Sequence, residues 1–228
     1  YVSHKEYSGL KYFIKGKGYF NMDFLFNTLP NRLVPFDYET FFNSKTVFKI
    51  CVTDVETGEP VYFDKSQLDG DKKMINKVLR ASSSLPIFSP PVEINGKLYY
   101  DGGVTDSIPI EKSIEDGNIC NVIVLTRNRG YVKKKQRLGP YSKHYLKKYP
   151  NILKALSARH IKYNKALEKI NILEKEGYAF VFRPIAPLKV NRLEKDITKL
   201  EELYNQGYKE AMERIDQLKR WIEEVSKE

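Results

Sequence analysis

The chain has 228 residues, of which 41% are hydrophobic and 30% charged, and its formal net charge is +10. This length is enough for one large domain or two small ones with a sizeable core. No apolar run approaches the roughly 20 residues that a membrane helix needs, and the start lacks the apolar segment of a signal peptide. Cys51 and Cys120 lie in apolar runs, which indicates buried thiols in a reducing compartment rather than a disulfide framework.

Local patterns predict alternating strands and helices after an aromatic, irregular start over residues 1–45. Runs of β-branched and aromatic residues predict the strands, and apolar residues three and four positions apart predict the helices. In chain order, we expect a short helix over 23–29, strands over 46–54 and 60–63 forming a hairpin, a helix over 71–81, a strand over 96–100, a helix over 110–116, a strand over 119–126, a helix over 151–176, a strand over 178–182, and a helical region over 193–226 that Gly207 divides in two.

The order strand, helix, strand over residues 96–126 predicts a βαβ unit with parallel strands and a right-handed crossover. We therefore expect a single α/β domain over residues 1–228, with a mainly parallel sheet flanked by helices on both faces. The apolar stripes of residues 151–176 and 193–226 are expected to pack against that sheet, with Trp221 anchoring the last helix.

One basic segment holds the whole excess of positive charge. Residues 118–165 contain 13 Lys and Arg and no Asp or Glu, whereas 26 basic and 29 acidic residues lie elsewhere. Residues 127–150 of this segment are also rich in tyrosine, and we expect them to form an exposed segment outside the packed core. An anionic membrane surface is the partner we expect for residues 127–165. A plain solvated face is the alternative, and no motif supports nucleic-acid binding.

The strongest candidate site is Asp101, followed directly by Gly102 and Gly103. The acid comes at the carboxyl end of a predicted strand, the edge where ligands collect in open α/β sheets, and the glycines allow close approach. A tight turn without function is the alternative. Asp54 reads as a turn acid. Asp106 lies too close to Asp101 in the sequence for the two acids to form a glycosidase pair. The three histidines, His4, His144 and His160, are scattered and lack the spacing of metal ligands, so we expect no metal or cofactor.

Taken in order, several segments resemble a patatin-like phospholipase of a bacterial branch. They are Ala81-Ser82-Ser83-Ser84-Leu85-Pro86-Ile87-Phe88, Pro90-Pro91, Tyr100-Asp101-Gly102-Gly103-Val104, Ile108-Pro109-Ile110, the hairpin residues Thr53-Asp54 and Thr57-Gly58, and the tail Leu203-Tyr204-Asn205-Gln206-Gly207-Tyr208. The resemblance covers roughly residues 1–225. It implies a patatin-like α/β fold and an acyl hydrolase with a Ser-Asp dyad, in which Asp101 is the aspartate and phospholipid or another acyl ester is the substrate.

The chain departs from this family in one essential respect. No serine has glycines two places before and two places after it, and no glycine-rich oxyanion loop is present. Because the first residue is not Met, we expect a missing N-terminal segment to carry the nucleophile. The chain alone is then inactive, and the intact enzyme is cytoplasmic and peripheral to membranes. The alternatives are a non-catalytic lipid- or protein-binding relative and, third, a basic nucleic-acid-binding protein.

Overall fold

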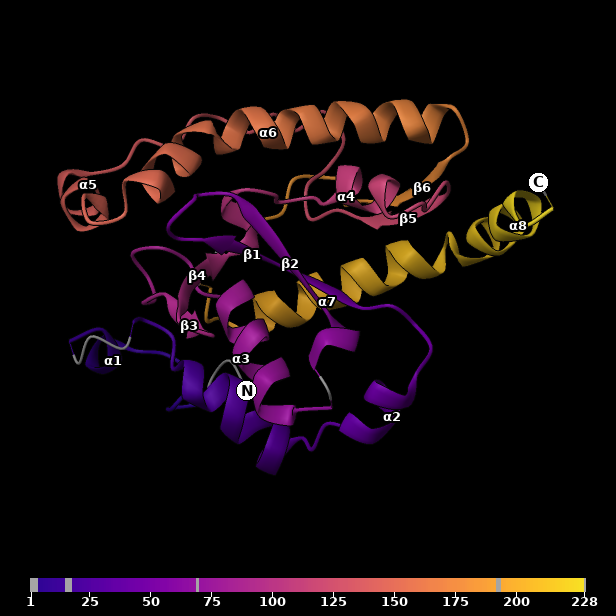
Figure 1. The fold of residues 1–228 in the computed structure, drawn as a ribbon. Coiled ribbons are helices and arrows are strands. Elements are labelled where there is room, and N and C mark those ends of the chain that lie inside the picture. The colour runs from indigo at the N-terminus through magenta and orange to yellow at the C-terminus, as the bar shows by residue number, and fades with distance from the viewer. Residues whose placement is uncertain (1–3, 15–17, 69, 192–193, 228) are drawn as a thin grey trace. The chain divides into compact units, whose positions relative to one another are not determined.

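A computed structural model describes residues 4–14, 18–68, 70–191 and 194–227 (Figure 1). Cα packing divides the chain into two compact units. The first unit comprises residues 4–108 and 134–163, and the second comprises 109–133 and 164–227. None of the helices in the described ranges is long and apolar enough to cross a bilayer.

The first unit is built around a four-stranded antiparallel sheet with the order β2-β1-β4-β3. Its strands are β1 (Lys49–Asp54), β2 (Pro60–Asp64), β3 (Val92–Ile94) and β4 (Lys97–Asp101). The predicted hairpin of β1 and β2 is confirmed, with Cys51 opposite Tyr62. A second hairpin joins β3 to β4 through Asn95 and Gly96, whose φ angles of 50° and 77° suit a two-residue turn.

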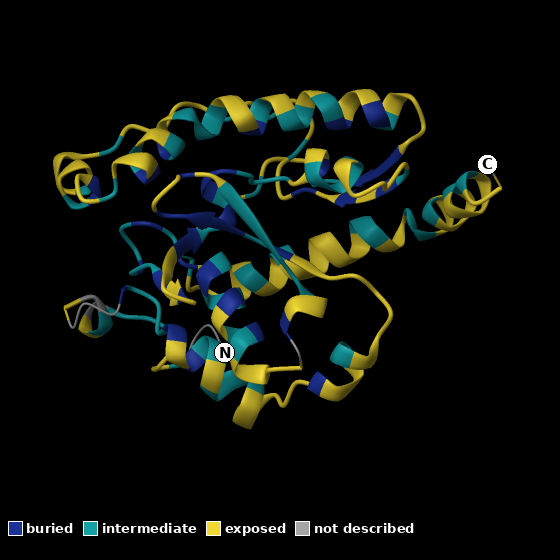
Figure 2. Ribbon diagram, in the orientation of Figure 1, coloured by how far each residue is buried: buried dark blue, intermediate teal, exposed yellow. Residues whose placement is uncertain are grey.

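Helices cover both faces of this sheet. Successive strand residues point to opposite faces, so neighbouring side chains pack against different helices. Tyr99 packs on one face in a cluster with the helix α3 (Lys72–Ser82). Tyr100 packs on the other face, with Leu146 of α5 (Pro140–Leu146) and Ile152 of α6 (Pro150–Lys175). Both tyrosines are buried. Figure 2 colours the buried parts of this unit dark blue. The remaining segments of this unit are α1 (Leu10–Ile14), the π-helix η1 (Phe24–Leu33), α2 (Tyr38–Asn43) and the 3₁₀ turns η2 (Lys65–Leu68) and η3 (Gly102–Val104).

The predicted helix over 71–81 is confirmed as α3, and its first turn shows why it begins there. The Asp71 carboxylate accepts hydrogen bonds from the amides of Lys73 (2.7 Å) and Met74 (3.2 Å), two of the donors that a helix start leaves unpaired. Ile75 and Val78 then bury the face that packs on the sheet.

The second unit holds the only parallel strand pair among the described residues, β5 (Asn121–Val124) with β6 (Ala179–Phe182). Its helices are α4 (Ile110–Glu115), the later part of α6, α7 (Ile197–Met212) and α8 (Ile215–Val225). As expected, Trp221 anchors α8: its indole nitrogen donates to the Gly177 carbonyl at 2.8 Å, and its ring lies 5.9 Å from that of Phe180.

Three fold expectations are corrected. The sheet is not mainly parallel, because β1–β2 and β3–β4 are joined by turns too short for anything but antiparallel pairing. Strands β4 and β5 belong to different sheets, so the expected βαβ unit between them does not form. The last helical region breaks at Glu213–Arg214 instead of Gly207, which lies inside α7.

The apolar stripe expected over residues 193–226 is also not a packing face throughout. Residue 193 lies outside the described residues, and α7 buries none of its side chains, with Tyr204 and Tyr208 exposed. The stripe over 151–176 is confirmed, since Ile152, Leu156 and Ile170 of α6 are buried.

Candidate active site

Asp101 is the last residue of β4, and the strand fixes its main chain on both sides. Its amide donates to the Ser84 carbonyl at 2.9 Å, and its carbonyl accepts from the Thr53 hydroxyl at 2.8 Å. Asp101 also lies opposite Val52 of β1 in the sheet register. The main chain of this acid is therefore held both by the sheet and by the segment that follows α3.

The carboxylate of Asp101 is turned back over the residues that follow it. Its Oδ1 accepts a hydrogen bond from the Gly103 amide at 2.6 Å, which caps the 3₁₀ turn η3. The residue is half-buried, so the carboxylate lies at the border of the packed interior. This hydrogen bond restricts how far the side chain can rotate.

Gly102 and Gly103 are needed for different spatial reasons. A Cβ on the buried Gly102 would lie 2.4 Å from the Cys51 carbonyl oxygen, so the η3 turn passes directly against β1. A Cβ on Gly103 would lie 3.0 Å from Oδ1 of Asp101 and 3.4 Å from Nη2 of Arg159. Gly102 thus allows the loop to approach the sheet, and Gly103 leaves space for a carboxylate and a guanidinium.

Arg159 of α6 is the residue at this site that the sequence did not reveal. Its Nε donates to the Ser107 hydroxyl at 3.4 Å, and that hydroxyl donates to the Gly103 carbonyl at 2.7 Å. Arg159 lies 52 positions from Ser107 in a helix crowded with basic residues. Only the three-dimensional structure distinguishes it from its solvated neighbours.

A second acid, Asp106, lies on the same loop and accepts a hydrogen bond from the Tyr62 hydroxyl. Burial is the main cause that raises the pKa of Tyr62, and this hydrogen bond is the second.

Other polar residues around the loop have structural roles. Thr53 and Thr105 share a 2.8 Å hydrogen bond beneath the loop, and both are buried. Asp54 is confirmed as a turn acid, since its carboxylate accepts from the amides that follow it.

The serines before β4 are not placed as nucleophiles. The Ser82 hydroxyl donates to the Cys51 carbonyl, and the Ser84 hydroxyl donates to the Arg80 carbonyl, each at 2.8 Å. Ile87, shortly after them, has φ 78°, a left-handed conformation that costs a β-branched residue of order 1–3 kcal/mol. The serine–proline segment therefore has a structural role beside Asp101.

Cys51 is half-buried and free, as is Cys120, so neither is as deeply buried as expected. Burial, reinforced by the charges of Asp106 and Asp101, raises the pKa of the Cys51 thiol to about 12. Because only the thiolate is nucleophilic, we expect iodoacetamide near pH 8 to label Cys51 about 10³-fold more slowly in the folded protein than in urea. Peptide mass spectrometry of a Cys120→Ser variant measures this, and equal rates in both states would contradict the buried environment.

The same shift predicts how stability depends on pH. The unfolded chain releases the Cys51 proton near the ordinary thiol pKa of about 8.5, whereas the folded chain holds it up to about 12. The contribution of the protonated Cys51 thiol to the free energy of unfolding is therefore fully present below about pH 8.5, and it declines as the pH rises from there toward 12.

The described ranges contain no group of three His, Cys, Asp or Glu side chains that could hold a metal ion. His160 is half-buried, and its Nδ1 is buried without a hydrogen-bond partner.

Two family models match different parts of the chain. The model of the patatin-like phospholipases matches residues 2–114, the part that contains β1 to β4 and the Asp101 loop. Residues 2–114 of the chain therefore resemble the patatin-like phospholipase family. The patatin-like match ends well before residue 225, and a separate model, a domain of unknown function (DUF6363), matches residues 149–223. The patatin-like segment thus resembles a family of lipid hydrolases.

The chain is also similar to the uncharacterized protein YjjU of Escherichia coli strain K12. The two are 26% identical over 130 residues, which is 55% of this patatin-like chain and 35% of YjjU. The chain therefore spans about a third of the length of that relative.

Proposed function

We propose that this patatin-like chain forms the aspartate half of a lipid acyl hydrolase with a Ser-Asp dyad. Asp101 is the general base, and the nucleophilic serine comes from outside residues 1–228. The observation that carries this proposal is the strand-fixed carboxylate of Asp101, held over Gly103 by a 2.6 Å hydrogen bond. A base must be held in place to accept a proton in a defined direction.

In this mechanism the serine Oγ attacks the ester carbonyl carbon while its proton passes to the Asp101 carboxylate. The tetrahedral intermediate collapses, the bond to the leaving alcohol breaks, and the proton from Asp101 goes to that alcohol. Water then repeats the sequence on the acyl-serine and releases a fatty acid. Gly103 supports this role because a side chain there would displace the carboxylate.

The test is hydrolysis of a phospholipid and of a p-nitrophenyl acyl ester by two proteins. The chain of 228 residues alone should show no turnover, because no serine in it has the flanking glycines of a nucleophile elbow. A longer natural protein that adds such an elbow upstream should hydrolyse both esters. Turnover by the chain alone would refute an external serine. A longer protein inactive on every acyl ester would favour a non-catalytic lipid- or protein-binding relative.

We further propose that the basic residues between 127 and 165 hold the enzyme on anionic membranes. Lys134, Lys135 and Arg137 are exposed. The tyrosines contribute less than the sequence suggested, because Tyr145 and Tyr149 pack around Tyr100. Electrostatic attraction to anionic lipid headgroups, about 1 kcal/mol for each Lys or Arg side chain, is then the main contribution to the free energy of membrane binding.

This membrane proposal predicts a loss of vesicle binding when the charge is removed. The triple variant K134Q/K135Q/R137Q should bind phosphatidylserine-containing vesicles about 100-fold more weakly in sedimentation assays. Equal binding of the parent chain to neutral and anionic vesicles would contradict it.

A further inference from the structure

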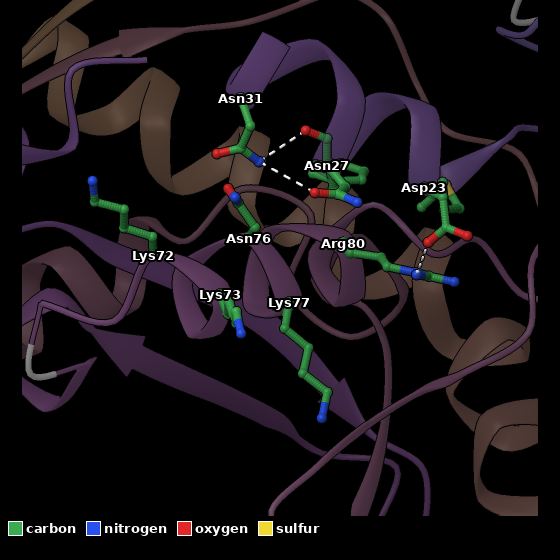
Figure 3. Close-up of a pocket in the computed structure, with 10 residues that line it drawn as sticks. Asp23, Asn27, Asn31, Lys72, Lys73, Asn76, Lys77 and Arg80 are labelled. Atoms are coloured by element: carbon green, nitrogen blue, oxygen red, sulfur yellow. Dashed lines mark hydrogen bonds and ion pairs between the residues drawn. The ribbon is translucent and has the colours of Figure 1, made fainter. Parts of the chain in front are cut away.

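Two cavities of about 590 Å³ each adjoin between η1 and α3 in the first unit. One is polar and opens beside the cationic side chains of α3 (Figure 3). The other is lined mainly by apolar and aromatic side chains of η1, α2, α3 and the approach to β1. Phe26 and Asn76 line both cavities, so the two volumes lie next to each other at these residues. Cavities of this size are typical of small-molecule sites.

The polar cavity has a strong excess of positive charge. Four cations line it, Lys72, Lys73, Lys77 and Arg80, against the single acid Asp23. Asp23 pairs with Arg80 at 2.9 Å, and no ion pair to the three lysines is formed by the described residues. Three ammonium groups on one helix repel one another, and a bound anion would relieve this repulsion.

The wall opposite α3 supplies neutral hydrogen-bonding groups. Figure 3 shows Asn27 and Asn31 of η1 facing Asn76 of α3, with Lys72 at one end of the cavity and the Arg80–Asp23 pair at the other. Asn31 donates to the Asn27 carbonyl at 2.8 Å. Apart from Asp23 at the start of η1, whose charge is paired with Arg80, this wall adds no negative charge that would repel an anion.

The adjoining cavity offers an apolar environment. Its aromatic lining comprises Phe26, Phe36, Tyr38, Phe41 and Phe48. Lys65 at its edge is already engaged, because its ammonium donates to the carbonyls of Phe41 and Ser44. Phe36 and Phe48 are 50% and 39% exposed, so the aromatic lining reaches the surface and a chain could enter there.

We propose that these two cavities form a binding site for a single-chain anionic amphiphile. Its anionic group lies among Lys72, Lys73 and Lys77, its hydrocarbon chain fills the aromatic cavity, and Phe26 and Asn76 flank the junction. A fatty carboxylate and a monoalkyl phosphate both fit this chemistry. The site goes beyond the proposed hydrolysis, because neither cavity is lined by Asp101, Gly102 or Gly103.

Isothermal titration calorimetry with four probes tests separately whether binding needs the anionic group and whether it needs the hydrocarbon chain. Decanoate and decyl phosphate should bind the chain at least tenfold more tightly than decanol, which lacks the anion, or inorganic phosphate, which lacks the chain. A preference for one of the two anions identifies a carboxylate or a phosphate source. If decanol binds as tightly as decanoate, or phosphate as tightly as decyl phosphate, the two cavities do not act together and the proposal is wrong.

Variants assign each half of the ligand to its cavity. K72Q/K73Q/K77Q should weaken decanoate binding at least tenfold and leave decanol binding unchanged. Thr46→Trp, which fills the aromatic cavity from its rim, should weaken both. The control K199Q/K209Q/K219Q removes the same charge from exposed positions on α7 and α8 and should leave both unchanged.

Equal loss in the control variant would show that net charge, not this cavity, attracts the anion and would overturn the proposal. Far-ultraviolet circular dichroism confirms that each variant is folded. These measurements need no turnover, so failure here would leave the proposed hydrolysis standing, and an inactive enzyme would leave the binding result standing.

Discussion

Replacing Asp101 by asparagine is expected to lower ester hydrolysis by about 10²–10⁴-fold in the longer protein that supplies the serine. Asparagine has the same shape and can still accept the hydrogen bond from the Gly103 amide, so the loop should keep its conformation. Its amide cannot take a proton from the serine. Initial rates on a p-nitrophenyl acyl ester, together with the urea midpoint of each variant, separate loss of the base from loss of the fold.

Two further variants serve as comparisons for the Asp101→Asn experiment. Asp216→Asn removes an exposed carboxylate from α8 and should leave both the rate and the urea midpoint unchanged. Gly103→Ala keeps the carboxylate but places a methyl group 3.0 Å from it, so the rate should fall with little change in stability. Wild-type turnover by the Asp101→Asn variant would remove this residue from the mechanism.

Gly102→Ala is expected to destabilise the first unit by about 3 kcal/mol. The added methyl group would lie 2.4 Å from the Cys51 carbonyl oxygen and 2.5 Å from its carbon. Those atoms belong to the backbone of β1, which is hydrogen-bonded to both β2 and β4 and cannot move without breaking the sheet. Urea denaturation followed by circular dichroism measures the change.

Gly207→Ala is the matched control for that measurement. Gly207 lies inside α7 with open space around it, so alanine should stabilise the helix by about 0.5–1 kcal/mol. A Gly102→Ala protein within about 0.5 kcal/mol of the parent would show that the loop does not pass against β1 as described.

The parts of the fold that could be predicted from the sequence depend on local interactions. Asp71 caps α3 through amides two and three positions away, and Gly177, with φ 86°, follows the end of α6, so neighbouring residues carry both signals. The hairpin of β3 and β4 was missed although Asn95-Gly96 is a strong hairpin signal. The break at Gly207 was predicted wrongly because the favourable residues around this glycine outweigh its low helix propensity.

Strand pairing and the surroundings of Asp101 depend instead on residues far apart in the sequence. The pattern identified β4 and β5 as strands but could not show that β4 pairs with β1 and β3 while β5 pairs with β6. Likewise, the motif identified Asp101 and its glycines, whereas Arg159 comes to Gly103 only when α6 packs in the first unit. Periodicity identifies elements, and it does not specify partners.

The anchoring of Asp101 has a consequence for the order in which the protein gains activity. The contact from the Thr53 hydroxyl to the Asp101 carbonyl closes a loop of 48 residues, so it depends on a sheet that is already assembled. Closing such loops is entropically costly and slows folding relative to local turns and helices. During refolding, helix α3 can therefore form before the acid is in place. Recovery of catalysis should then lag behind recovery of helical content, and partly folded molecules would not attack lipid.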